Sequence, residues 1–210
     1  MIWTEIQEEI DRCRICENRE IPHLIVPIGV KRHPILDPPR PTRLLFVSVA
    51  PPQGGAYFWD ETQDDRLRTG LFKSLNYSGS VHQFCKEGFY LVPAVKCPSE
   101  SEGRDINPSP AAIASCARHL KDEIATCKPE RILALGRCAL AALAKVFGLR
   151  KSGKINKDRH VYFWVVVDDQ VVPIGVTYFP GNRRHGHFDL IAKDITRILN
   201  LEPRRTTIVV

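Results

Sequence analysis

Four cysteines, in three separate stretches of the chain, supply the residue type that binds zinc and iron-sulfur clusters. Cys13 and Cys16 have two residues between them, so both thiolates can reach one metal centre from a helix end or a turn. Cys97 follows an apolar run, and Cys116 lies 18 intervening residues later in a predicted helix. The spacing alone leaves three interpretations open: zinc, an iron-sulfur cluster, and isolated buried thiols.

The remaining three of the seven cysteines have no such context. Cys138 lies in an apolar helical stretch and Cys127 follows another, which favours buried structural thiols over ligands. An odd total in a chain expected to meet a reducing compartment favours thiols and metal ligands over disulfides.

The length of the chain and its N-terminal pattern limit how many domains and which kinds of segment it can contain. Its 210 residues suffice for one core, so we expect a single domain over residues 1–210. Within it, 1–42 should form a helix followed by an extended proline-rich segment, and 203–210 a tail. The start carries no signal-peptide pattern, and no apolar stretch approaches a membrane span. A soluble, cytoplasmic protein is therefore expected.

The charge balance favours a polyanionic partner. The formal net charge is +6 and the sequence pI is about 9.0, values that also occur in proteins without such partners. Several basic residues fall in predicted loops, where they can reach backbone phosphates. Their clusters are 12–19, 31–43, 150–159 and 183–184.

Hydrophobic patterning predicts strands that alternate with helices. Apolar runs indicate buried strands, and two β-rich runs near the C-terminus indicate a hairpin whose second arm joins the sheet. The predicted strands are 43–49, 89–95, 131–136, 161–167 and 171–178, and the predicted helices 4–13, 67–76, 110–126, 137–147 and 188–199. This order indicates an α/β fold, a three-layer α/β/α sandwich around a central, mostly parallel sheet. Such folds place their sites at the carboxyl ends of the strands.

An ordered set of short motifs identifies a known family. The motifs lie at 13–16, 49–52, 95–98, 107–108, 128–137 and 179–182. In this order they resemble the uracil-DNA glycosylase superfamily, and within it the branch that carries a four-iron, four-sulfur cluster. The resemblance runs from Cys13 to about Phe188. It implies a 4Fe-4S cofactor with four ligands: Cys13, Cys16, Cys97 and Cys116.

The resemblance also implies DNA as the partner and monomeric action. Members of the family turn a damaged base out of the duplex and hydrolyse its glycosidic bond, using donors and a positioned water. Three positions depart from the family pattern. Val49 replaces the first-loop acid, Pro93 replaces the asparagine that reads the base, and Phe179 replaces the histidine near the leaving oxygen.

Acidic replacements for the missing groups follow the first loop. Asp60 and Glu61 are candidate catalytic residues, able to orient water or to stabilise a cationic sugar. The alternative is a solvated acidic stretch, because Asp64 and Asp65 follow closely.

The segment 182–187 offers a second set of replacements. We expect His185 to donate to a base carbonyl and Asn182 to help bind the base. Arg183, Arg184 and His187 are the corresponding DNA contacts, by holding a phosphate or entering the duplex. The alternative is an exposed basic turn before the last helix.

Base binding is assigned to the loop after the first strand. Phe58, within three successive aromatics, is the predicted stacking residue, and ordinary core packing is the alternative. Backbone amides at Gln53 and Gly54 are expected to read the base, since glycine permits close approach.

Three functions remain open. The leading one is a monofunctional DNA glycosylase that excises uracil or another deaminated base. The second is a catalytically silent or differently active nucleic-acid-binding protein on the same iron-sulfur scaffold. The third, a small redox protein, is disfavoured because widely spread ligands tie down a fold more than they expose a redox centre.

Overall fold

The computed structural model of the chain describes residues 2–24, 36–52, 58–181, 187–202 and 204–205. At its centre is a sheet whose strands lie in the order β2, β1, β5, β7 and β6. The first four run parallel, and β6 pairs antiparallel with β7 as the predicted hairpin. The bounds are β1 Leu44–Ser48, β2 Phe89–Pro93, β5 Ile132–Leu135, β6 Phe163–Val167 and β7 Gln170–Thr177.

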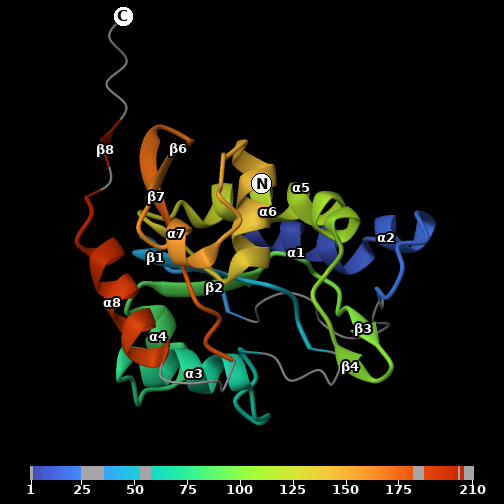
Figure 1. Cartoon of the computed structure of the whole chain (residues 1–210), viewed down its shortest axis with the longest axis horizontal. Coiled ribbons are helices and arrows are strands. Elements are labelled where there is room, and N and C mark those ends of the chain that lie inside the picture. Colours follow the sequence, from blue (N-terminus) through green and yellow to red (C-terminus); the bar gives the residue numbers. More distant parts are fainter. Residues whose placement is uncertain (1, 25–35, 53–57, 182–186, 203, 206–210) are drawn as a thin grey trace, which may run out of the picture.

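Helices cover both faces of this sheet (Figure 1). One face carries α1 (Trp3–Arg12), α5 (Pro110–Cys127) and α6 (Arg137–Phe147), and α5 packs against both of the others. The other face carries α3 (Arg66–Leu75), α4 (Val81–Lys86) and α8 (His187–Leu199). The predicted three-layer α/β/α sandwich with a mostly parallel sheet is confirmed.

Burial explains why the central runs form strands. Every residue of β1, β2 and β5 is buried, as expected for parallel strands covered by helices on both faces. The edge strand β6 instead alternates between buried and more exposed positions, which suits a strand with one face towards water.

Local signals set the helix ends. The Ser109 hydroxyl accepts a hydrogen bond from the Ala112 backbone N–H at 3.2 Å and so caps the N-terminus of α5. Asp65 caps α3 in the same way, and Ser80 caps α4. Between β5 and α6, Gly136 has a φ of 92°, a conformation that residues with a Cβ rarely adopt.

Several short elements were not predicted. They are α2 (Ile15–Asn18), α4, α7 (Ile155–Asp158) and the small hairpin of β3 (Glu100–Ser101) and β4 (Arg104–Asp105). Within the predicted tail, β8 (Arg204–Arg205) pairs with β7, so that part extends the sheet. His119, on α5, is buried. Among the described residues, no helix combines the length and apolarity needed to cross a membrane.

Candidate active site

A cleft of about 970 Å³ opens where the parallel strands end. Its walls come from the segments that follow β1, β5 and β7, from the start of α3 and from the stretch after β4. The lining includes Val49, Ala50, Pro51, Pro52, Asp64, Asp65, Arg66, Leu67, Ser99, Asp105, Ile106, Asn107, Gly136, Arg137, Cys138, Ile155, Phe179 and Gly181. This is the sheet edge at which the sequence predicts a site.

A small apolar niche of about 30 Å³ adjoins the cleft at the ends of β1 and β2. Cleft and niche share Ala50, Pro51, Pro52, Asp65 and Leu67 as walls. The niche is completed by Ser48, Phe58, Trp59, Leu91 and Pro93, so Ser48 and Asp65 bring hydroxyl and carboxyl groups into an otherwise apolar lining.

Asp65 is the acidic residue that the structure brings to both spaces. Its side chain caps α3 by accepting a hydrogen bond from the Arg68 backbone N–H. Burial raises the pKa of the Asp65 carboxyl, although the backbone amides of Arg68 and Leu67 oppose this effect. The sequence presents Asp65 as part of an acidic surface run, and only its position as an N-cap signals otherwise.

The two predicted catalytic acids point elsewhere. The Asp60 carboxylate accepts hydrogen bonds from the backbone and hydroxyl of Thr62, and these bonds lower its pKa. Glu61 accepts a 3.1 Å bond from the Val81 backbone N–H at the start of α4. Neither residue is among those that line the cleft or the niche.

Phe58, the predicted stacking residue, lines the niche but is only 4 % exposed. Its ring contacts Trp59, Phe72 and Phe84 with centroid separations of 5.2, 5.9 and 5.6 Å. The neighbouring Trp59 donates its indole N–H to the Leu91 carbonyl at 3.2 Å. Phe58 is therefore a core residue that also forms part of the niche wall.

The three residues that depart from the family pattern all lie at this site. Val49 and Phe179 line the cleft, and Pro93 lines the niche. All three side chains are apolar and donate no hydrogen bond. Any polar chemistry at these strand ends must therefore come from other groups.

Part of the predicted site lies outside the described residues. This applies to Gln53 and Gly54 of the first loop and to the segment Asn182, Arg183, Arg184 and His185. His187 is described as the first residue of α8, where its ring stacks on Tyr178 at 4.1 Å. Its place in the fold is beside the end of β7, and it is not among the residues lining the cleft.

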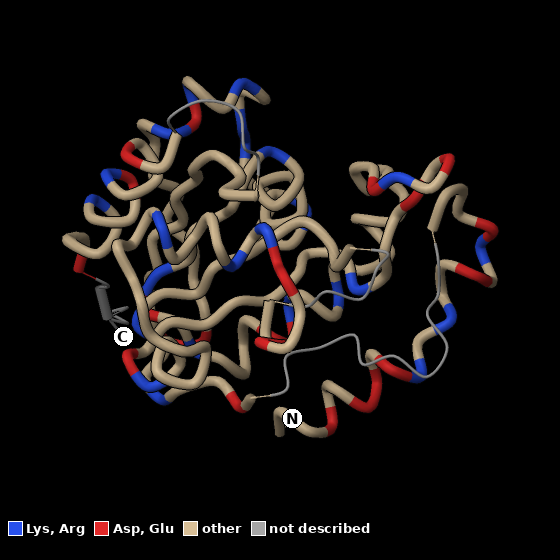
Figure 2. Tube along the Cα trace, turned by 90° about the horizontal axis from the view of Figure 1, so that it is seen from below, with Lys and Arg blue, Asp and Glu red and all other residues tan. Residues whose placement is uncertain are grey.

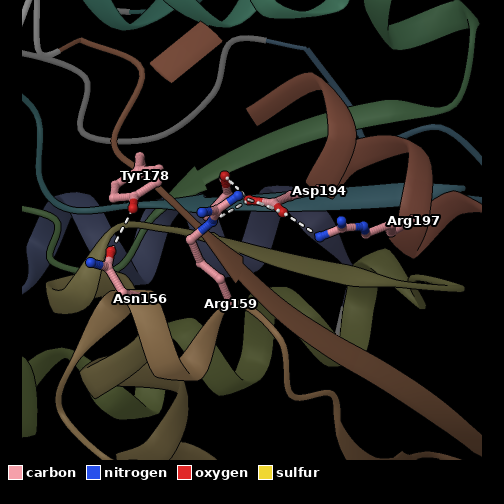
Figure 3. A network of polar contacts seen from close by, with 6 residues as sticks. Asn156, Arg159, Tyr178, Asp194 and Arg197 are labelled. Carbon is pink, nitrogen blue, oxygen red and sulfur yellow. Dashed lines mark hydrogen bonds and ion pairs between the residues drawn. The ribbon is translucent and has the colours of Figure 1, made fainter. Parts of the chain in front are cut away.

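A buried polar network fixes the end of β7 (Figure 3). Asp194 of α8 accepts two hydrogen bonds from Arg159, at 2.7 and 3.0 Å, and one from Thr177 at 2.7 Å. The Arg159 guanidinium also lies 4.6 Å from the Tyr178 ring centroid. These contacts hold α8 and the segment after α7 against the strand from which Phe179 enters the cleft.

The predicted metal ligands come together from three parts of the fold. Cys13 ends α1, Cys16 lies in α2, Cys97 follows β2 and Cys116 lies in α5. A hydrogen bond between Cys16 and Cys116 raises the pKa of Cys16 and lowers that of Cys116 to about 7. Cys97 and Cys13 are close enough for their charges to raise the pKa of Cys16 further.

This arrangement falls short of a single-ion site. Across the described part of the chain, no three His, Cys, Asp or Glu side chains form a group that could hold a metal ion. The four thiols approach one another, but the metal assignment stays a prediction.

A buried ion pair joins the cysteine region to the niche. Lys96, 2 % exposed, donates to the Glu123 carboxylate on α5 and to the Pro93 carbonyl at the end of β2. Lys96 directly precedes Cys97, so one ammonium group ties a niche wall to the helix that carries Cys116.

Charge is dispersed over the molecule (Figure 2). Lys and Arg occur on many elements among acidic residues, and the acidic residues are dense along α1. In the described cleft lining, Arg66 and Arg137 stand against Asp64, Asp65 and Asp105. The cleft floor is therefore not itself a strongly basic surface.

The family comparison covers this entire site. Residues 34–195 match the Uracil DNA glycosylase superfamily, a range that contains every residue of the cleft and niche linings. The match includes Cys97 and Cys116 but begins after Cys13 and Cys16. No curated protein matches the chain. Because the match spans most of the sequence and all of the site, the chain belongs to the uracil DNA glycosylase superfamily.

Proposed function

We propose that this protein is a DNA glycosylase that hydrolyses the N-glycosidic bond of uracil or another deaminated base. The observation that carries the proposal is the cleft at the carboxyl ends of β1, β5 and β7, with an apolar niche and a buried carboxyl beside it. Membership of the superfamily supports a hydrolase that acts on DNA. DNA is accordingly the proposed partner, and the monomer the proposed acting form.

The dimensions of the site indicate how a base would bind. The niche of about 30 Å³ has room for little more than water, so a flipped base would lie across its mouth within the cleft. There the apolar faces of Pro51, Pro52 and Leu67 exclude water from the base. The side chains of Pro93 and Val49 cannot read the base edge, so reading falls to backbone groups and to Ser48.

We propose that the four cysteines bind the 4Fe-4S cofactor that the family resemblance implies. In a four-iron cluster each thiolate binds a different iron, so the sulfurs stand farther apart than around a single ion. The four thiols come together from three parts of the fold and interact with one another, which supports a shared cofactor. A bound cluster would join α1, α2, the stretch after β2 and α5. It is proposed here as a structural cofactor.

The function is tested by incubating the purified protein with oligonucleotides that carry uracil, hypoxanthine or xanthine, in single and double strands. Alkaline cleavage then reveals abasic sites, and identical strands without the modified base serve as the control. Abasic product from at least one modified base, and none from the control strand, is expected.

The second candidate function is a silent nucleic-acid-binding protein on the same scaffold. The apolar side chains of Val49, Pro93 and Phe179 at the strand ends favour it. It predicts no abasic product from any base, together with DNA binding that weakens as salt rises because counterion release drives phosphate contacts. That pair of results would replace the glycosylase proposal.

A further inference from the structure

Asp65 occupies a position that its neighbours in sequence do not share. It is 7 % exposed, and it is a lining residue of both the niche and the cleft. Of the acidic residues that follow the first loop, Asp60 bonds to Thr62 and Glu61 to the start of α4. Within the described lining of the niche, Asp65 is the only acidic residue.

The surroundings of Asp65 suit a carboxylate that must be both charged and basic. Removal from water penalises the ionised form, while the amides at the N-terminus of α3 stabilise it. Burial is the larger effect and raises the pKa of Asp65 above its usual range. Such a group accepts a proton more readily than an exposed aspartate does. The electrostatic attraction between its charge and a neighbouring cation is also stronger than at an exposed site, because water screens it less.

We infer that Asp65 is the catalytic carboxylate of this site. It takes the role of the first-loop acid, whose position Val49 occupies in this chain. The inference rests on the proposed glycosylase function and names the residue that performs its chemistry. It moves that role from Asp60 and Glu61, which face away, to the one acidic side chain of the run that reaches both spaces.

The reaction balances without any further reactant than water. The bond between C1′ of the deoxyribose and the base nitrogen breaks, and its electron pair leaves with the base. The Asp65 carboxylate stabilises the cationic sugar and accepts a proton from the water whose oxygen bonds to C1′. That proton passes to solvent, and the departing base takes one from solvent.

The other role of Asp65, as the N-cap of α3, can be separated by experiment. Asparagine caps helices as well as aspartate does, so Asp65→Asn keeps the cap and removes the proton acceptor. Asp65→Glu keeps a carboxylate. Ser80→Ala, at the N-cap of α4 and outside the cleft, is the control for loss of a cap.

Excision from the base that the wild type accepts is measured in single turnover across a pH series. We expect Asp65→Asn to melt within a few degrees of the wild type yet to lose about a hundredfold or more in rate. Its KM and its affinity for abasic-site DNA should change little. Asp65→Glu should retain part of the rate, and Ser80→Ala nearly all of it.

The pH profile provides a second readout. The wild-type rate should fall in acid as Asp65 is protonated, with the midpoint above the range of an exposed aspartate, and this limb should vanish in Asp65→Asn. Near wild-type excision by Asp65→Asn, or a loss confined to KM, would overturn the role of Asp65 and leave the glycosylase function standing. A wild type that excises no base would overturn both.

Discussion

Gly70 lies where α3 comes closest to the last loop of the site. A Cβ built on Gly70 would stand 2.2 Å from the Pro180 carbonyl oxygen, far inside any contact that real side chains make. Pro180 belongs to the stretch that follows Phe179 and leads to the predicted DNA-contact segment. Because Gly70 has no side chain, α3, which Asp65 caps, can approach that stretch closely.

Substitution of Gly70 should reverse the usual preference of helices for alanine. In an ordinary helix interior, Gly→Ala stabilises by about 0.5–1 kcal/mol. Here we expect Gly70→Ala to destabilise by about 1–3 kcal/mol, because the backbone of Pro180 must move, and to lower excision. Urea unfolding measures the first effect. The exposed neighbour Thr69→Ala should change stability by no more than about 0.5 kcal/mol, and a stabilised Gly70→Ala would show that no close contact exists.

At the scale of elements, the segments around β7 depend on one buried carboxylate. Asp194 holds Arg159 and Thr177 by short hydrogen bonds, and Arg197 adds a longer, half-exposed contact of 3.5 Å. Through Asp194, hydrogen bonds link α8 both to Thr177 of β7 and to Arg159 after α7 (Figure 3). Tyr178, at the end of β7, adds a 2.5 Å hydrogen bond to Asn156 of α7.

Removing one partner of this buried pair should be costly. Asp194→Asn leaves the Arg159 guanidinium buried without its counter-charge, so we expect a loss of about 3–5 kcal/mol in the free energy of unfolding. Arg197→Ala removes the exposed partner of the same carboxylate and should cost about 1 kcal/mol or less. Thermal and urea unfolding of the two variants test the difference. Equal losses in the free energy of unfolding would mean that burial does not decide how much these contacts contribute to stability.

For the whole molecule, the cysteine region joins segments that are distant in sequence. α1 and α2 lead the chain and pack against α5, and the stretch after β2 reaches the same place. If the proposed cluster binds there, it cross-links the N-terminal helices to the central layer, and its binding free energy adds to the stability of the folded state.

Loss of one ligand should therefore act on the whole fold. We expect Cys97→Ser to lose the brown colour and the bound iron of anaerobically purified protein and to unfold several degrees lower. The control is Cys85, a buried thiol that donates a hydrogen bond to the Asp37 carbonyl at 3.4 Å. The Cys85→Ser variant should keep both the colour and the iron. Colourless wild-type protein that contains zinc would replace the cluster with a zinc site.

The sequence by itself determined the layers of this protein and the sheet edge at which the cleft opens. The runs 44–47 and 132–135 are apolar throughout, and only a sheet covered on both faces buries such runs completely. The Ser109 cap and the β6–β7 hairpin were predictable for a similar reason, since both depend on residues close together in the chain.

Only the tertiary structure decided which acidic residue lines both the cleft and the niche. Asp60, Glu61 and Asp65 look alike in sequence, because local composition does not reveal which neighbour supplies a hydrogen bond. Thr62 and the start of α4 engage the first two, and α3 turns the third inward beside Pro51 and Pro93. Burial and charge environment are properties of contacts between distant segments, so they appear only when the chain is folded.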